Sequence, residues 1–454
     1  MDGLRRGLLR HAASRGLRSR FLCSAAAPTP TVAHVLGGAV FFAAAERGTA
    51  HALAACDLRL PPSITALCAL GALSSIPALG GPLNAALGPA AAWMRGALPV
   101  LLVPAFLFPA VVEMPPSEQL PVLAFFGAAG VVATVAATGH TAAALVRAAP
   151  PLVVDAHAAS AAAASALLSS RRTAALALVG GAALSAALSQ VAGPSRAACM
   201  APAYVGVTVA AYVAAARALP AAVKKFCPPN VGCAIVLALF FSAWGGSEEV
   251  RCYLDGAGAA LLVAVQPCMV TLGLYAHTHR AVLVQQRVAL LALCAVTCPL
   301  LLFGLGAAGA ALGLPAENVA SFLPASTTTG LALLMPSGMP LAKQEWIAAG
   351  TAFNSGVVQL TLPLLLTGTA LASRSAFARG VGIGCTAHVG GMVALLAAGE
   401  TAAADAAAVV LVVVGVARSL LIQFPPFSRA LAGVCEGRTP WGGDDERRRG
   451  SPTT

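Results

Sequence analysis

The fold class is decided by one stretch of sequence, RVALLALCAVTCPLLLFGLGAAGAALG at residues 287–313. After Arg287 this stretch carries no charged side chain. It exceeds the roughly 20 mostly apolar residues that a helix needs to cross the hydrocarbon core of a bilayer. Its apolar residues are continuous and do not alternate with period two, which excludes a transmembrane β-strand. The stretch therefore predicts a membrane-spanning helix.

Similar stretches recur along the chain. Of its 454 residues, 58% are hydrophobic and only 10% are charged, and the mean hydropathy of +0.82 lies outside the range of soluble proteins. We expect an all-α polytopic membrane protein with about 10–12 transmembrane helices or half-crossings. The expected spans lie near 31–55, 61–80, 90–112, 119–146, 173–191, 197–219, 229–244, 256–276, 287–313, 345–371 and 404–424. The turn sequence Gly80-Gly81-Pro82 is expected to separate two of them.

The formal net charge is +11, but the basic residues are scattered through loops and form no stripe with aromatic residues. We therefore expect no nucleic-acid partner. Loops 147–172, 217–225 and 280–287 together hold eight basic residues, whereas the alternate loops hold only Arg196 and Arg251. The positive-inside rule places the richer set on the matrix or stromal side of the membrane.

The sequence carries no motif for a cofactor or a catalytic centre. Twelve cysteines form no C-x-x-C pair, and we interpret them as small packing residues of helices. No Walker motif, dinucleotide fingerprint or metal-ligand set is present. We expect neither an enzyme nor a cofactor-binding or metal-binding protein.

The two ends differ in composition from the membrane part. Residues 1–30 hold six arginines and one acid, Asp2, with serines among leucines and alanines, which is typical of an organelle transit peptide. Residues 434–454 are polar and rich in Gly and charged residues, and we expect a disordered tail. Between the ends, the Ala/Ser-rich stretch 147–172 is expected to link a membrane module at 31–146 to a second one at 173–433.

Two apolar segments of the second module, 320–341 and 376–398, are interrupted by Pro, Gly and hydroxyl residues. Irregular backbone is tolerated at membrane depth only where protein buries it or where it lines a wet cavity. We therefore predict that both segments are broken or re-entrant helices, and each contains a candidate site.

The first candidate site is the stretch Leu-Pro-Ala-Ser-Thr-Thr-Thr-Gly at 323–330. Pro324 frees backbone groups, and a helix that starts after Ser326 would direct its amides and the hydroxyls of Thr327, Thr328 and Thr329 at a carboxylate. Alternatively, these hydroxyls only satisfy the helix around a proline kink.

The second candidate site is the glycine-rich run that contains Arg379 and His388. His388 is either a proton or pathway residue or a satisfied buried histidine. Arg379 either pairs with the substrate or extends to the membrane interface.

Three other polar positions stand out in the second module. Gln266 precedes Pro267 in mid-span, and Asn230 follows two prolines; both are candidate substrate contacts. Asn354 is expected to form hydrogen bonds between helices.

These residues carry a resemblance to the LrgB family. The matching stretches are Leu323 to Thr329 and Ala378-Arg379-Gly380 through Ala387-His388 to Gly391, together with Gln266-Pro267 and Pro229-Asn230. Ala325 stands where the family has a basic residue. The first half resembles the partner LrgA family in Leu60 to Ile64 and in Trp93 to Pro104.

A fusion of both families is similar to the plastidal glycolate/glycerate translocators of plants and algae. The resemblance implies a secondary transporter of small 2-hydroxy-carboxylates in the plastid (chloroplast) inner envelope membrane, with the mitochondrial inner membrane as the alternative. A holin-like pore, an envelope-regulating protein and a carrier for another monocarboxylate such as pyruvate stay open, and so does a homo-oligomer.

Overall fold

The computed structural model describes most of the chain from residue 32 to residue 438. The gaps in this description are 59, 108–115, 146–170, 191–194, 225–226, 228, 275–278, 325–331, 333–338, 340, 344–345, 348, 352, 355–356, 359–360, 362–374 and 398–399. The transit peptide, most of the linker and most of the polar tail that the sequence predicts lie outside the described residues. Within them the regular structure is helical, with no strand, which confirms the all-α prediction.

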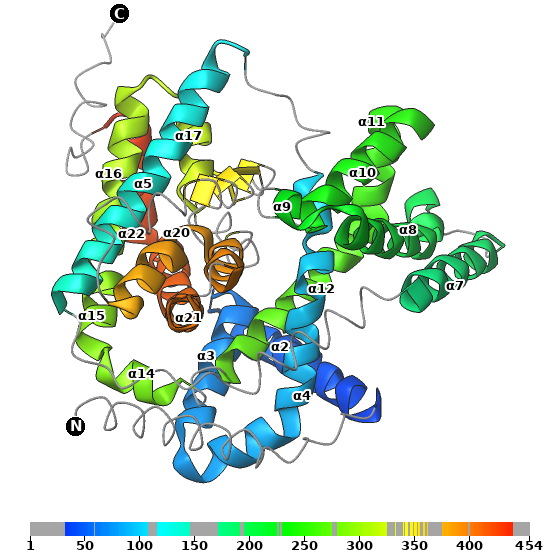
Figure 1. Ribbon diagram of the computed structural model, residues 1–454, viewed down its shortest axis with the longest axis horizontal. Coiled ribbons are helices and arrows are strands. Elements are labelled where there is room, and N and C mark those ends of the chain that lie inside the picture. Colours follow the sequence, from blue (N-terminus) through cyan, green and yellow to red (C-terminus); the bar gives the residue numbers. More distant parts are fainter. Residues whose placement is uncertain are drawn as a thin grey trace, which may run out of the picture.

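The first three helices lie together in the lower part of Figure 1. They are α2 (Val32–Ala55), α3 (Pro62–Ser75) and α4 (Pro77–Leu101), followed by the short 3-10 helix η1 (Val103–Phe106) and by α5 (Gln119–Leu145). The turn expected at Gly80-Gly81-Pro82 lies inside α4, so that expectation was wrong. Helix α4 begins after the extended residue Ile76 and accommodates three prolines, one of them Pro82. A helix packed against neighbours in a membrane tolerates this, because other groups satisfy the backbone atoms that proline frees.

The remaining helices form two further groups. The middle group comprises α7 (Arg171–Ser189), α8 (Arg196–Ala218), α9 (Ala221–Lys224), α10 (Pro229–Trp244), α11 (Gly246–Tyr253), the π-helical turn η3 (Leu254–Gly258), α12 (Ala259–Val270) and η4 (Thr271–Leu274). The C-terminal group comprises α14 (Arg280–Gln285), α15 (Arg287–Ala292), the π-helical turn η5 (Leu293–Thr297), α16 (Cys298–Ala311), α17 (Ala316–Phe322), α20 (Ala376–Ala397), α21 (Thr401–Gln423) and α22 (Pro425–Cys435).

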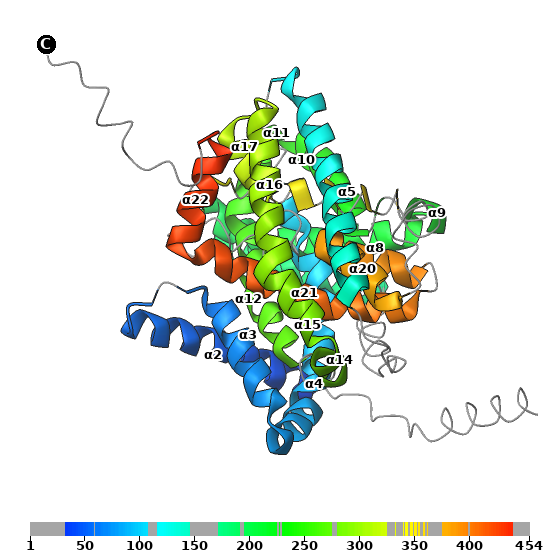
Figure 2. The ribbon, with the colours of Figure 1, turned by 90° about the vertical axis from the view of Figure 1, so that its left-hand side faces the viewer.

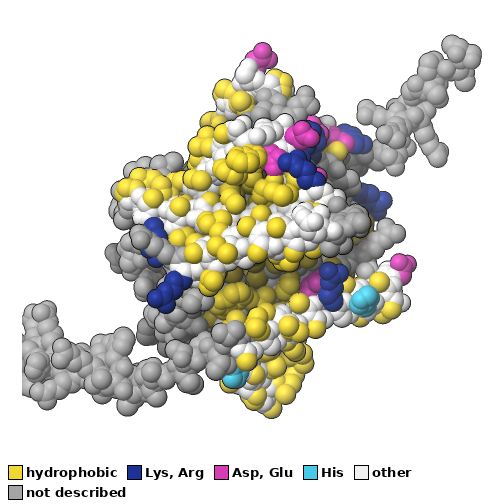
Figure 3. All heavy atoms as spheres, turned by 90° about the vertical axis from the view of Figure 1, so that its right-hand side faces the viewer, with side chains coloured by type: hydrophobic (Ala, Val, Ile, Leu, Met, Phe, Trp, Pro, Cys, Tyr) yellow, Lys and Arg dark blue, Asp and Glu magenta, His cyan; other side chains and the backbone are white. Residues whose placement is uncertain are grey.

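Seven helical stretches among the described residues are long and apolar enough to cross a membrane, so the protein is a multi-pass membrane protein. They are Pro77–Phe106, Gln119–Leu145, Arg172–Ser189, Arg196–Ala218, Gly246–Leu274, Arg287–Ala311 and Ala402–Gln423. Two shorter apolar helices, α3 and α10, add to them. In Figure 3, hydrophobic and neutral atoms cover the centre of one face, and charged side chains lie mainly toward its margins.

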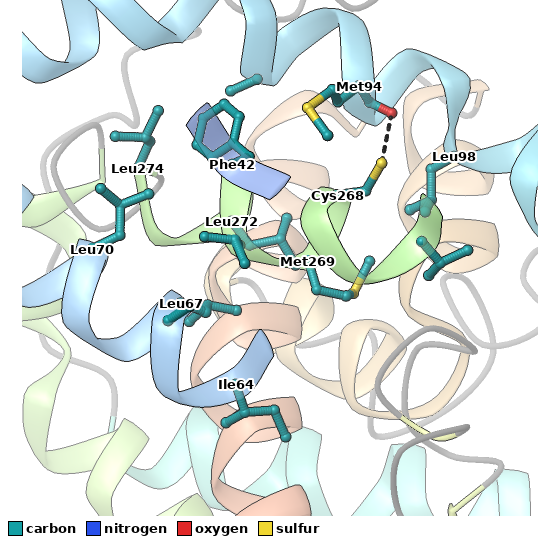
Figure 4. Close-up of a cluster of buried hydrophobic side chains, with 14 of the residues drawn as sticks. Phe42, Ile64, Leu67, Leu70, Met94, Leu98, Cys268, Met269, Leu272 and Leu274 are labelled. Atoms are coloured by element: carbon teal, nitrogen blue, oxygen red, sulfur yellow. Dashed lines mark hydrogen bonds between the residues drawn. The ribbon is translucent and has the colours of Figure 1, made fainter. Parts of the chain in front are cut away.

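One core joins the N-terminal helices to the middle of the chain. Phe42 of α2, Leu67 of α3 and Met94 of α4 surround Met269 and its neighbours at the end of α12 (Figure 4). The Cys268 thiol lies 3.6 Å from the carbonyl oxygen of Met94. This core fixes α12 among the first three helices.

The second core region is a bundle in which α20 packs against both α5 and α21. Three glycines of α20 make these contacts possible. A methyl group at Gly380 would lie 2.1 Å from the carbonyl oxygen of Ala403, and one at Gly384 would lie 2.8 Å from the Cα atom of Ala407, both on α21. On another face of α20, a methyl group at Gly382 would lie 3.1 Å from the carbonyl oxygen of Val135 on α5.

The prediction that segment 376–398 is broken or re-entrant was wrong, because α20 is one continuous helix over Ala376–Ala397. Its 22 residues give a length of about 33 Å. The glycines that suggested a break instead allow the backbones of neighbouring helices to approach closely, as small residues do in membrane bundles. Figures 1 and 2 both show α20 beside α5 and α21.

Candidate functional site

The first predicted site lies at the end of α17, where the described chain stops. Leu323 and Pro324 follow α17 directly, and both are buried. Ser326, Thr327, Thr328 and Thr329 lie outside the described residues. The described structure therefore places the start of the predicted carboxylate cradle inside the C-terminal bundle.

Arg379 lies in the first turns of α20 and forms an ion pair with Glu400, the residue before α21. The Nη2 atom of Arg379 donates a hydrogen bond to Oε2 of Glu400 over 2.5 Å. The two side chains are 18% and 32% exposed, so the pair is shielded from solvent only in part. This pair bridges the start of α20 and the start of α21.

The other predicted residues are spread over three helices. His388 lies in α20, but its side chain is outside the described part of the structure. Gln266 is half-buried in α12, which packs against α2, α3 and α4, and Asn230 is half-buried in the first turn of α10. The packing of these helices places Gln266 and Asn230 in different surroundings from those of α20.

A small cavity lies beside Leu323. Its volume of about 20 Å³ leaves room for roughly one water molecule. Helix α5, helix α16, the end of α17 and the segment around Asn354 line it. Its lining residues are Phe126, Gly127, Gly130, Val131, Thr134, Leu305, Phe322, Leu323 and Asn354.

Two polar side chains of the cavity have an atom that finds no hydrogen-bond partner among the described residues. These atoms are Oγ1 of Thr134 and Oδ1 of Asn354, and the two residues are only 1% and 5% exposed. A buried polar atom without a partner costs about 1–3 kcal/mol, so native structures keep few of them. Their position on one cavity wall makes them candidates for contact with a polar ligand.

The rest of the wall is apolar and closely packed. A methyl group at Gly127 would lie 2.7 Å from Cε1 of Phe353, and the rings of Phe322 and Phe353 meet edge to face with centroids 6.5 Å apart. Aromatic rings and glycine backbone therefore make up much of the cavity lining beside the two polar residues, and polar contacts are stronger in such apolar surroundings than in water.

Helix α5 carries further hydroxyl groups beyond the cavity. Thr134, Thr138 and Thr141 lie on one helix face, because four and three residues separate them. The Thr138 hydroxyl donates to the Thr134 carbonyl oxygen over 2.7 Å, and the Thr297 hydroxyl donates to Oγ1 of Thr141 over 3.2 Å. Sequence reasoning missed this stripe, although the spacing of the threonines was visible in the span 119–146.

Among the described residues, no group of three or more His, Cys, Asp or Glu side chains could hold a metal ion. The bundle around α5 and α20 instead offers hydroxyl, amide and guanidinium groups. Such groups bind small oxygen-rich anions by hydrogen bonding and charge.

A known protein family matches the region of the chain that holds these candidate residues. Residues 208–426 match the model of the LrgB-like family. This LrgB-like region contains every candidate residue that the sequence singled out, from Asn230 to His388. Helix α5, which supplies Thr134 to the cavity, precedes it in the sequence and packs into the same bundle. No curated protein and no solved structure gives a match.

Proposed function

We propose that the protein is a secondary transporter that carries small 2-hydroxy-carboxylates, such as glycolate and glycerate, across an organelle inner membrane. The observation that carries this proposal is the cavity beside Leu323, where Thr134 and Asn354 present polar atoms that have no partner in the described part of the chain, inside a bundle of membrane-spanning helices. The resemblance to the LrgA and LrgB families supplies the substrate class, and the plastid inner envelope is the proposed location.

The chemistry of the cavity suits this substrate class. A 2-hydroxy-carboxylate has a hydroxyl group that can donate to the Asn354 amide oxygen and a carboxylate that can accept from the Thr134 hydroxyl. Ser326, Thr327, Thr328 and Thr329, which follow Pro324, are proposed to add further donors for the carboxylate. Ala325 brings no charge to this stretch, so the positive charge must come from another element.

The cavity volume bears on the transport mechanism. Room for roughly one water molecule is too little for glycerate. The substrate can therefore enter only when the helices around the cavity separate, as alternating access in a carrier requires. In this proposal His388 serves as proton or hydroxyl partner, and Gln266 and Asn230 contact the substrate along its route.

The test is uptake of labelled glycerate by liposomes that contain the purified protein. We expect saturable uptake, and we expect His388→Ala and Thr328→Val each to reduce it. Thr49→Val is the control, because the Thr49 hydroxyl donates to the Ala45 carbonyl oxygen within α2. Unchanged uptake in both site variants would remove these residues from the site, and no uptake by the wild type would remove the substrate assignment.

A holin-like pore is the second candidate function, favoured by the LrgB-like match itself. A pore passes ions without saturation, whereas a carrier saturates. Conductance of planar bilayers that contain the protein separates the two functions. Competition by pyruvate in the uptake assay tests the third candidate, a carrier for another monocarboxylate, and imaging of the tagged full-length protein separates plastid from mitochondrion.

A further inference from the structure

One arginine is fully enclosed by the C-terminal bundle. Arg418 lies in α21, inside the candidate span Ala402–Gln423, and only 2% of it is exposed. A charged side chain near the end of a span usually extends to the interface, but Arg418 is buried among other helices. Charges held inside a membrane bundle are costly and mark substrate or ion pathways.

The contacts described for Arg418 are with neutral groups. Its Nη1 atom donates a hydrogen bond to the carbonyl oxygen of Cys385 in α20 over 3.2 Å. The guanidinium is also within hydrogen-bonding reach of the Cys298 thiol at the start of α16, with Cys294 nearby. These groups hold the side chain in place between α16, α20 and α21.

The helix that faces Arg418 is irregular. The π-helical turn η5 separates α15 from α16 and packs against both α5 and α21. Its Thr297 hydroxyl donates to Thr141 of α5. Single π-helical turns within α-helices occur frequently at functional sites, and one of them lies here between the threonine face of α5 and the helix that carries Arg418.

A short polar path joins Arg418 to the cavity. Cys385, whose carbonyl accepts from Arg418, has its thiol within hydrogen-bonding reach of the Thr138 hydroxyl. Thr138 lies one turn from Thr134, a distance of roughly 6 Å along the axis of α5, and Thr134 lines the cavity. The sequence of contacts therefore runs from Asn354 and Thr134 through Thr138 to Arg418.

We propose that Arg418 is the anion-binding residue of this path and that its guanidinium pairs with the carboxylate of the substrate when the bundle opens. This inference rests on the proposed transport function and extends it, because it states what selects an anion over a neutral molecule of the same size. It also supplies the positive charge that Ala325 does not provide. A guanidinium suits this role, because it remains charged when buried and binds both carboxylate oxygens at once.

The experiment compares wild type, Arg418→Gln, Arg418→Lys and the control Arg429→Gln, each in two assays. Arg429 is a matched control because it lies in α22 on the surface, where its Nε atom donates to Pro425. The first assay measures uptake of labelled glycerate and of neutral glycerol by proteoliposomes. The second measures the rise in unfolding temperature of the purified protein in detergent when glycolate, glycerate, acetate or glycerol is added.

We expect Arg418→Gln to lose at least tenfold in the apparent affinity for glycerate, since hydrogen bonds to charged groups contribute that much or more. Its discrimination between glycerate and glycerol should fall by a similar factor. Arg418→Lys keeps the charge without the bidentate geometry, so we expect uptake with a several-fold higher KM. Arg429→Gln should match wild type in both assays.

The outcomes separate this inference from the proposed function. If wild type shows no uptake but small carboxylates stabilise wild type and not Arg418→Gln, the anion site stands and the transport function fails. If Arg418→Gln takes up glycerate with the wild-type KM, the inference is overturned. If Arg418→Gln does not fold, Arg418→Lys decides, and an unchanged KM together with unchanged stabilisation by carboxylates assigns Arg418 to a structural role.

Discussion

The Nη2 atom of Arg379 and the Oε2 atom of Glu400 lie 2.5 Å apart and join the start of α20 to the start of α21. From the sequence, Arg379 could serve the substrate or the membrane interface. In the structure its described ion pair is with Glu400, a residue that sequence reasoning did not single out. The pair lies at one end of the close contact between α20 and α21.

The pairing of Arg379 with Glu400 is testable by charge exchange. We expect Arg379→Glu to destabilise the protein, because two carboxylates would face each other. We expect the double variant Arg379→Glu with Glu400→Arg to recover most of the loss, with a coupling on the order of 1 kcal/mol, since both groups are partly exposed. Thermal unfolding in detergent measures the stability. Glycerate uptake by the double variant then tests the substrate role, because a residue that binds carboxylate would not regain function when its charge is moved to position 400.

The Thr134 hydroxyl has no hydrogen-bond partner among the described residues. We expect it to lower the stability of the fold and to contribute to substrate binding. We expect Thr134→Val to leave the free energy of unfolding unchanged or to raise it by about 1–3 kcal/mol, because valine removes a buried hydroxyl that has no partner. Uptake of glycerate should fall about tenfold or more. Thr49→Val provides the comparison. A Thr134→Val protein with wild-type uptake would show that the cavity does not contact the substrate.

The close packing of α20 against α21 predicts opposite effects at two glycines. Gly380→Ala would place a methyl group 2.1 Å from the carbonyl oxygen of Ala403, and we expect a loss of about 1–3 kcal/mol in unfolding free energy from overpacking. In Gly304→Ala, the added methyl group in α16 would meet no atom within 4 Å. We expect this variant to stabilise its helix by about 0.5–1 kcal/mol. Unfolding temperatures in one detergent check both. Equal effects at the two positions would contradict the packing of α20.

A buried carboxylate links α11 to α8 in the middle group through hydrogen bonds. Glu249 is only 4% exposed; it accepts a hydrogen bond from Arg196 over 2.7 Å and another from the Tyr204 hydroxyl. We expect Glu249→Ala to destabilise the protein by about 1–3 kcal/mol, because the Tyr204 hydroxyl would lose its acceptor in a buried site. Glu248→Ala, at an exposed position one residue away, should stay within about 0.5 kcal/mol of wild type. A similar loss in both variants would show that the network does not contribute to stability.

Local features of the sequence are sufficient to predict that the chain is helical and crosses the membrane several times. Stretches such as 287–313 are long, apolar and uncharged, and in hydrocarbon every backbone polar group must find its partner within the protein, which a helix provides locally. The same reasoning from local sequence identified Pro324 as a position that frees backbone hydrogen-bonding groups. It could also have marked Arg418, the single charged residue of the run 406–423.

The roles of the polar and small residues, in contrast, depend on how distant helices pack. Glycines in 376–398 could break a helix or let another backbone approach, and the choice depends on the carbonyl of Ala403 and on Val135, which are distant in sequence. Likewise, Asn354 was expected to bond across helices; its Oδ1 atom has no partner among the described residues, and Asn354 lines a cavity with Thr134. Periodicity specifies which face of a helix is polar, whereas the partner of that face depends on how distant helices pack.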